Sequence, residues 1–217
     1  MEGIRMEVIS LNVGKPVTVD YRGKPLETGI YKLPAEGPVR LHAEGFDGDG
    51  QADLVNHGGV NRAVCVYPIE HYTFWEEHLG KQLAYSAFGE NITVSGLLET
   101  EVCIGDVYEI GTALLQVSQP RFPCFKLSQK HGANDMPAKV LSTGYSGFYF
   151  RVLREGAVGT GDTVVKVESG KGDYTVRRVL KAMEVGRKDK TDLKELAEIS
   201  ALTDEIRDDF RKWLERE

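Results

Sequence analysis

Short apolar runs rich in β-branched and aromatic residues dominate the first three quarters of the chain. They occupy residues 5–13, 16–21, 38–46, 62–68, 91–96, 107–120, 147–156 and 162–169. Turn-forming Gly, Asp or Pro closes most of these runs, which is typical of β-strands. Few helical stretches separate them. The pattern therefore predicts a mostly β fold, a closed or nearly closed β-barrel of short antiparallel strands with a few short helices.

One stretch within this region has helical periodicity instead. Residues 68–81 read PIEHYTFWEEHLGK, with Pro68 suited to a first turn and Gly80 suited to a C-terminal cap. Ile69 and Tyr72 fall near one face of the predicted helix. We expect its two histidines, His71 and His78, at the surface.

The pattern changes near residue 170, where SGKGD indicates a turn or linker. Helical periodicity then predicts three helices over residues 174–183, 191–200 and 203–217. Thr191 and Thr203 are the expected N-caps of the second and third helices. The third helix has a narrow apolar stripe formed by Ile206, Phe210, Trp213 and Leu214.

Two domains are therefore predicted, a β-barrel domain over residues 1–170 and a small three-helix C-terminal domain over residues 171–217. The thin apolar faces of the helices suit docking on the barrel or on a second subunit. A homodimer is one arrangement that this pattern allows.

Charge narrows the choice of partners. The chain has 27 Lys and Arg against 33 Asp and Glu, a net charge of −6. Segment 171–217 holds 12 of each sign, so the first 170 residues carry the whole acidic excess. This disfavours binding to a nucleic-acid polymer through a basic surface. No apolar run approaches the roughly 18 residues of a membrane span, and the N-terminus lacks signal-peptide features, so we expect a cytoplasmic protein.

The three cysteines are Cys65, Cys103 and Cys124. An odd number without CxxC spacing argues against a disulfide framework and a structural zinc site. Cys65 and Cys103 lie in strand-like runs, where a free cysteine is usually a small buried apolar residue.

Cys124 has different neighbours, in the stretch SQPRFPCFKL. Pro120 and Pro123 stiffen the backbone around it. Arg121 and Lys126 would lower the pKa of the thiol if they point toward it, and a thiolate is a nucleophile and a ligand for soft metals. The alternative is an unreactive cysteine in a loop.

Three further stretches offer candidate ligands. In DLVNHGGVNRAV, the two glycines and Arg62 could form an anion-binding loop, and His57 could act as an acid, base or ligand. Asn91, at the start of a predicted strand, could contact the edge of a heterocycle. Lys32, in ETGIYKLP, could bind a phosphate. The structural alternatives are a hydrogen-bonding His57, a turn asparagine and a solvated lysine. His131 could close over Cys124 or lie in a loop.

Taken together, these stretches resemble the MOSC domain family, and within it the YiiM-type branch. The resemblance is carried by GIYKLPAEGPVRL, QADLVNHGGVNRAVCVYPIEHYTFW, FGENITVSGLLETEVCIGDVYEIG, VSQPRFPCFKL and GFYFRVLREGAVGTGD. They keep one order and cover most of residues 25–165. The charged C-terminal segment resembles the three-helix extension of that branch.

The resemblance implies a barrel-like MOSC fold that binds the molybdenum cofactor, a molybdopterin. It implies that Cys124 is catalytic and ligates molybdenum, with His57 as a second catalytic residue. The cofactor-binding residues that it implies are Thr28, Lys32, Arg62, Asn91 and Arg121.

The implied activity is reduction of small N-hydroxylated compounds, such as hydroxylaminopurine-type base analogues, in detoxification. No flavin, haem or iron–sulfur signature is present, so an external flavin-containing reductase would supply electrons. One alternative is a sulfur carrier or transferase that uses a Cys124 persulfide. Others are a cofactor-storage protein and a binding scaffold without chemistry.

Overall fold

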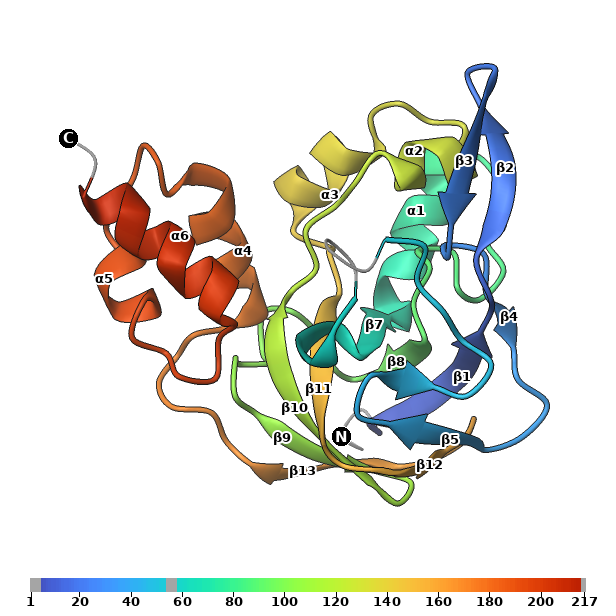
Figure 1. Ribbon diagram of the computed structural model, residues 1–217, viewed down its shortest axis with the longest axis horizontal. Coiled ribbons are helices and arrows are strands. Elements are labelled where there is room, and N and C mark those ends of the chain that lie inside the picture. The colour runs from blue at the N-terminus through green and yellow to red at the C-terminus, as the bar shows by residue number, and fades with distance from the viewer. Residues whose placement is uncertain (1–4, 54–57, 216–217) are drawn as a thin grey trace.

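The computed structural model describes residues 5–53 and 58–215 of the chain. A sheet-rich body forms the larger part, and a group of helices from the C-terminal segment packs beside it (Figure 1). No helix in the described residues is long and apolar enough to cross a lipid bilayer.

Most of the strands follow the predicted apolar runs. The strand bounds are β1 Glu7–Val13, β2 Val17–Tyr21, β3 Lys24–Thr28, β4 Leu33–Pro34, β5 Val39–His42, β6 Gly45–Phe46, β7 Val64–Pro68, β8 Ile92–Ser95, β9 Val107–Ile110, β10 Ala113–Pro120, β11 Phe148–Arg154, β12 Gly156–Val158 and β13 Val164–Glu168. Of these, β3 and β4 lie outside the predicted runs.

Helices lie between and after the strands. Their bounds are η1 Val60–Arg62, η2 Ile69–His71, α1 Tyr72–Leu79, α2 Lys126–His131, α3 Met136–Thr143, α4 Val176–Val185, α5 Leu193–Leu196 and α6 Asp204–Glu215. The predicted helix over 68–81 is thus confirmed as η2 and α1, and Gly80 ends it in the left-handed conformation.

Eight of the strands in the described chain form one mixed sheet, in the order β13-β9-β10-β11-β7-β8-β1-β4. Neighbours are antiparallel except β7 and β8, which are parallel with Val66 opposite Ile92. The parallel pair brings two chain segments into register at one end. There the backbone N–H of Asn91 donates to the backbone carbonyl of Cys65 at 2.8 Å.

The predicted closed barrel is not shown, because this sheet has two ends, β13 and β4, among the residues described. Backbone bonds do join β1 to the segment before β13. Val8 N–H donates to the Asp162 carbonyl at 2.9 Å, and Gly161 N–H donates to the Val8 carbonyl at 2.8 Å. These bonds accompany one isolated antiparallel bridge, Glu7 with Thr163, rather than a ladder between two strands.

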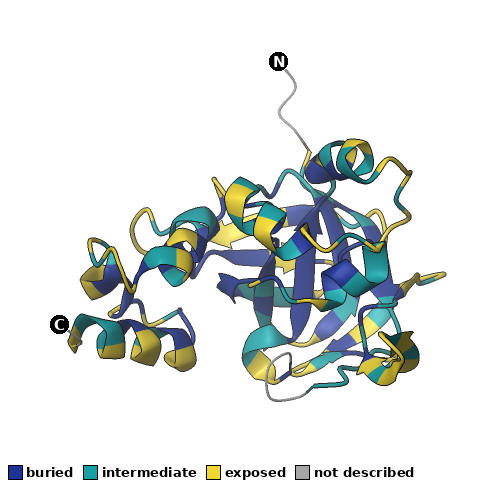
Figure 2. Ribbon diagram, turned by 90° about the horizontal axis from the view of Figure 1, so that it is seen from above, coloured by how far each residue is buried: buried dark blue, intermediate teal, exposed yellow. Residues whose placement is uncertain are grey.

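The sheet is buried under helices and loops on its flanks (Figure 2). An aromatic cluster fixes α1 against it. Tyr67 of β7 stacks on Phe88 with ring centroids 3.9 Å apart and accepts a hydrogen bond from Trp75 Nε1 at 2.6 Å. Such stacked and hydrogen-bonded aromatics hold the loop before β8 in one position.

The two histidines of the 68–81 segment differ from each other. His78 is half-buried beside Asp135, whereas His71 is buried and lies 2.7 Å from the carboxylate of Glu99. The prediction of a surface position is therefore wrong for His71. Its ring stacks on Tyr145, an aromatic partner that lies far along the chain and is not visible in the local pattern.

The C-terminal helices confirm three predicted helices in type, with shifted bounds. Thr175 caps α4. Thr203 directly precedes α6 and its carbonyl accepts from Arg207 N–H at 3.1 Å, but its hydroxyl has no hydrogen-bond partner in the described structure, so the predicted side-chain cap is not formed. Thr191 is not the N-cap of α5, because its hydroxyl binds Asp189 and Asp192 occupies the cap position.

The helices pack on the body through the segment before β9. Val176 N–H donates to the Val102 carbonyl at 2.8 Å, and Ile104 N–H donates to the Tyr174 carbonyl at 2.9 Å. Apolar side chains of α4 and α6 belong to the same buried cluster as those of β10. The division of the chain into two domains at residue 170 stays a prediction.

Candidate functional site

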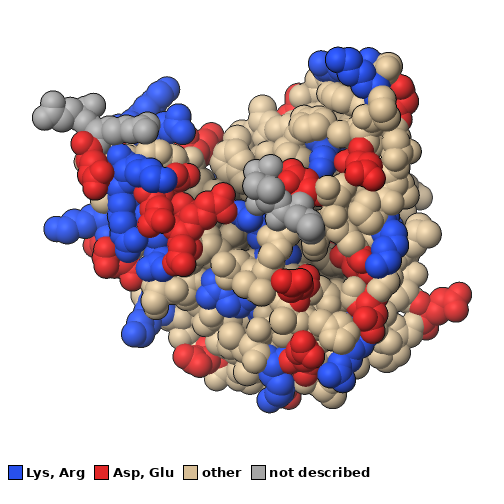
Figure 3. Space-filling model, viewed as in Figure 1, with Lys and Arg blue, Asp and Glu red and all other residues tan. Residues whose placement is uncertain are grey.

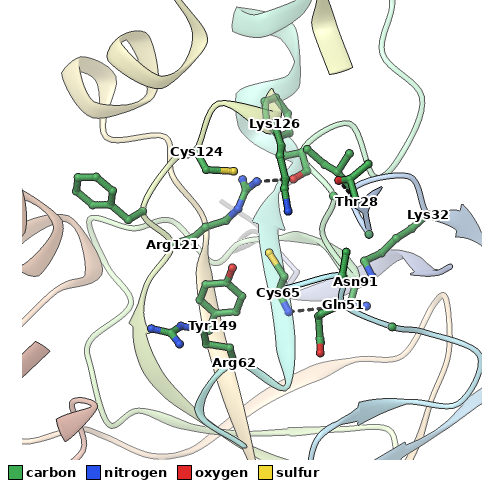
Figure 4. A pocket seen from close by; sticks show the side chains of 17 residues that line it. Thr28, Lys32, Gln51, Arg62, Cys65, Asn91, Arg121, Cys124, Lys126 and Tyr149 are labelled. Atoms are coloured by element: carbon green, nitrogen blue, oxygen red, sulfur yellow. Dashed lines mark hydrogen bonds between the residues drawn. The ribbon is translucent and has the colours of Figure 1, made fainter. Parts of the chain in front are cut away.

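A pocket of about 630 Å³, partly open to solvent, lies where the starts of β7 and β8 meet three loops (Figure 4). Six of the predicted site residues line it, Thr28, Lys32, Arg62, Asn91, Arg121 and Cys124. His57, the seventh, lies outside the described residues. The structure therefore brings all the described members of the predicted set of site residues to one cavity.

Lys32, Cys65 and Asn91 line one side of the pocket, and together with the buried carboxylate of Asp49, which Lys32 and Asn91 contact, we call them the strand wall. The side-chain amide of Asn91 is fully engaged in it. Its Oδ1 accepts from Cys65 N–H at 3.1 Å, and its Nδ2 donates to Asp49 Oδ2 at 2.9 Å and to the Asn12 carbonyl at 3.3 Å. Asn91 thus joins β7, β8 and a loop at the pocket floor.

Lys32 is buried in the strand wall, with its side chain 4% exposed, and forms an ion pair with Asp49, whose side chain is 3% exposed. Asp49 also accepts from Gly14 N–H at 3.0 Å. The hydrogen bonds to Asp49 offset part of the cost of burying this pair. Lys32 is neither a solvated lysine nor an uncompensated cation.

Thr28 is buried at the pocket edge, where its hydroxyl accepts from Ile30 N–H at 3.2 Å. This bond forms a local turn and shapes the loop that carries Lys32.

Arg62 is the last residue of η1 and forms an ion pair with Glu205 at 2.5 Å. Glu205 lies on α6, so a residue of the C-terminal helices reaches the pocket rim. The Arg62 side chain is 13% exposed and that of Glu205 64%. The helices therefore compensate one of the cations that line the cavity.

Residues 121–126 form the opposite side of the pocket, which we call the cysteine loop. Its Arg121 is buried and donates from Nη2 to the Phe88 carbonyl at 2.6 Å. Within the described residues no carboxylate forms a salt bridge with it. Burial opposes its charge, but the polar groups nearby, Cys65 first among them, raise the pKa of Arg121, so the guanidinium stays charged.

The two thiols of the pocket have different surroundings. Cys65 is buried in β7, and burial raises its pKa from 9.0 to about 11, so it stays protonated at neutral pH. Cys124 is partly exposed and lies in the cysteine loop, just before α2 begins. Its side chain is beside the guanidinium of Arg121 (Figure 4). Cys124 is thus the accessible thiol of the pair.

His131 does not line the pocket. Its Nε2 lies 2.8 Å from the Ala87 carbonyl, and burial lowers its pKa to about 4. The neighbouring Lys130 binds the Ile30 carbonyl at 2.9 Å, and burial lowers its pKa to about 8. These residues tie α2 to the loops around the pocket and do not close over Cys124.

Sequence reasoning missed several residues of this region. Asp49 lies in a Gly- and Asp-rich loop whose polar residues suggested only turns, and its partner Lys32 is 17 positions away. Tyr149, which lines the pocket from β11, was read only as part of a strand. Periodicity across three or four residues cannot reveal contacts of this range.

The chemistry of the donors constrains any metal. No cluster of three or more His, Cys, Asp or Glu side chains suited to a metal ion occurs in the part of the chain that the structure describes. A metal at Cys124 would therefore take its other ligands from a bound molecule. Cationic Arg121, Arg62 and Lys126 around the thiol favour an anionic one.

The MOSC domain family matches residues 53–165. An uncharacterized protein, YflK, from Bacillus subtilis is 50% identical over 100% of this chain and 98% of its own length. A protein named reductase from Gibberella moniliformis is 36% identical over 75% of this chain, which spans 30% of that protein.

A solved structure agrees with these relatives. The crystal structure of YiiM from Geobacillus stearothermophilus has a TM-score of 0.83 and 41% identity, covering 96% of this chain and 99% of that one. The similarity includes the C-terminal helices, because so little of either chain remains outside it.

Proposed function

This chain belongs to the MOSC domain family, in its YiiM-type branch, and on that premise we propose that it binds the molybdenum cofactor and reduces small N-hydroxylated compounds. A family named for the C-terminal domain of molybdenum-cofactor sulfurase supports cofactor binding. A relative named reductase supports an oxidoreductase. Hydroxylaminopurine-type bases are the substrates we propose.

One observation carries the proposal, the pairing of Arg121 with Cys124. A buried guanidinium without a carboxylate partner in the described residues is costly unless an anion binds it. Beside it lies a partly exposed thiol, held by a loop that contains Pro123. A bound molecule that is both anionic and metal-bearing satisfies both groups at once.

The residues present fit a molybdopterin. Cys124 would ligate the metal, since thiolates are good ligands for soft metals. Arg121 and Lys126 would hold its phosphate end, with Arg62, which is paired with Glu205, at the pocket rim. Lys32 and Asn91, which are already bonded to Asp49 or backbone, would shape the pocket floor rather than contribute free charge. When bound, the cofactor supplies a two-electron redox centre.

The proposed reaction is R–NHOH with two electrons and two protons giving R–NH₂ and water. The protein would position the N–OH group beside Cys124 and exclude bulk water from the pocket. The electrons would come from a separate flavin-containing reductase.

The proposal is tested by the molybdenum and pterin content of Cys124→Ser protein, purified without oxygen from cells that make the cofactor. Cys103→Ser is the matched control, since Cys103 lies in the segment that contacts the C-terminal helices, away from the pocket. We expect near-stoichiometric metal in wild type and control. In Cys124→Ser we expect loss of metal and a fall in 6-hydroxylaminopurine reduction of about 100-fold or more.

Absence of metal and pterin from all three proteins contradicts the proposal. Labile sulfur on Cys124 of that metal-free wild type would instead support the sulfur carrier or transferase.

A further inference from the structure

A second cavity lies on the other face of the cysteine loop. It is a cleft of about 1000 Å³ between this loop and the C-terminal helices, and we call it the helix cleft. Met183, Ile206 and Asp209 of α4 and α6 line its far side. Cys124 and Tyr149 line both the helix cleft and the first pocket, so the thiol lies where the two cavities meet.

Gln119, the penultimate residue of β10, lines the helix cleft. Its side chain is buried, with the residue 4% exposed, and its Oε1 has no hydrogen-bond partner in the described structure. A buried acceptor without a donor is unfavourable, and native structures contain few of them. This oxygen would be satisfied by an N–H or O–H group of a ligand in the cleft.

Charge distinguishes the helix cleft from the pocket. The pocket is lined by Lys32, Arg62, Arg121 and Lys126, and no carboxylate belongs to its described lining. The helix cleft is lined by Asp53, Glu205 and Asp209, with Arg62 and Lys126 at the side it shares with the pocket. The ion pair of Glu205 with Arg62 balances one charge of each sign, so the described lining of the cleft carries two further carboxylates, Asp53 and Asp209, and one further cation, Lys126.

The cysteine loop also presents planar apolar surface to the helix cleft. Phe122 is 45% exposed and Phe125 47% exposed, although both are large aromatic side chains. Exposed aromatic rings at the mouth of a cavity provide faces on which a flat ring can stack. Figure 3 shows many acidic and basic side chains over the C-terminal helices, whereas most of the body's visible surface is uncharged.

From these observations we infer that the helix cleft binds the heterocyclic substrate of the proposed reaction, with Gln119 accepting from its N–H groups and the carboxylates of α6 selecting uncharged substrates over phosphorylated ones. The inference rests on the proposed function for the identity of the reaction. The anionic cofactor and the uncharged substrate would then approach Cys124 from two cavities, of which only the helix cleft has carboxylates in its described lining.

The first test is the affinity of 6-hydroxylaminopurine riboside and of its 5′-monophosphate for the full-length protein loaded with the cofactor, so that the cationic pocket is occupied, measured by calorimetry without an electron donor. We expect the monophosphate to bind at least about tenfold more weakly, because its charges meet the cleft carboxylates. Equal or tighter binding of the monophosphate by wild type would overturn the inference.

Two variants of α6 and a matched control sharpen this test. Glu205→Gln and Asp209→Asn should each reduce the ratio of riboside affinity to monophosphate affinity about three- to fivefold. Asp208→Asn is the control, because Asp208 and Asp209 are both half-exposed and each faces a cation three residues on, but only Asp209 lines the cleft. If both variants keep the same affinity ratio as the control, the inference that these carboxylates select against phosphorylated ligands is wrong.

Gln119→Leu tests the buried acceptor. It should weaken riboside binding about three- to tenfold without lowering the melting temperature, since it removes an unpaired buried oxygen. Unchanged affinity, or a fall in melting temperature alone, would assign Gln119 a structural role and overturn its part in binding. Molybdenum and pterin content, measured on the same samples, separates these outcomes from failure of the proposed function: absence of the cofactor counts against the proposed function, whereas the affinities of loaded protein test the cleft.

Discussion

The strand wall and the cysteine loop face each other across one pocket, yet their polar groups are satisfied in opposite ways. In the strand wall, Lys32 pairs with Asp49, and Asn91 bonds to both Asp49 and the backbone. In the cysteine loop, Arg121 has one carbonyl acceptor and no salt bridge in the described residues, and Cys124 is partly exposed.

The difference separates stability from binding. Groups already paired in the protein contribute to folding and have little capacity left for a ligand. Groups left unpaired cost stability and gain partners only when a ligand arrives. We therefore expect substitutions in the strand wall to lower the free energy of unfolding. Substitutions in the cysteine loop should lower ligand binding with little effect on folding.

Lys32→Met gives the largest expected change in stability. It leaves Asp49 as a buried carboxylate without a cation, so the free energy of unfolding should fall by about 3–5 kcal/mol. Chemical denaturation monitored by circular dichroism measures this. Lys15→Met is the control, because the exposed Lys15 donates at 3.0 Å to the backbone carbonyl of the same Asp49. It should change stability by less than about 0.5 kcal/mol.

The double variant Lys32→Met/Asp49→Asn should recover part of the loss, since no uncompensated charge remains. A loss in Lys32→Met no larger than in Lys15→Met would show that Lys32 is held for binding rather than for folding. The contrast between wall and loop would then fail.

Most of the strands could be predicted from the sequence because alternating or continuous apolar runs carry that information locally. The helices α2 and α3 could not, and no helix was predicted between residues 126 and 143. Both helices are of eight residues or fewer, and each is ended by a glycine in the left-handed conformation, Gly132 and Gly144. Gly132, Asn134 and Pro137 lie within this stretch and interrupt a helical pattern. Sheet closure also depends on long-range pairing, so the barrel prediction went further than the structure supports.

In the site, too, the features that depend on local sequence could be predicted, and those that depend on distant residues could not. Proline-rich backbone and nearby basic residues marked Cys124 from sequence alone, because these neighbours are local. The partners Asp49 for Lys32 and Glu205 for Arg62 are 17 and 143 positions away. No local pattern can show that a cation is already compensated. The sequence therefore predicted which residues gather, and the structure shows which of them remain available.

Cys65→Ala should have an intermediate effect that depends on pH. The pKa of Cys65 is raised from 9.0 to about 11, so above pH 9 the folded state keeps a proton that the unfolded state loses. The stability of wild type should therefore fall by roughly 1.4 kcal/mol per pH unit between pH 9 and 11 from this group alone. In Cys65→Ala that part of the decline should vanish, as urea denaturation at pH 8, 9, 10 and 11 would show.

Several tyrosines also titrate in this range, so the quantity to compare is the difference between wild type and variant at each pH. A constant difference from pH 8 to 11 would mean that Cys65 ionises as freely in the folded protein as in the unfolded chain. The strand wall would then be as accessible as the cysteine loop.

Glu205→Gln should have the smallest effect on stability. The ion pair of Glu205 with Arg62 links α6 to the pocket rim, but Glu205 is 64% exposed, and exposed pairs contribute little. We expect the free energy of unfolding to change by less than about 0.5 kcal/mol, and the difference to shrink further at high salt. The apolar contacts of α4 and α6 with β10 hold the helices in place instead. A fall in the free energy of unfolding above about 2 kcal/mol would show that the ion pair holds the helices in place. Arg62 and Glu205 would then contribute to folding, as the strand wall does, rather than to ligand binding.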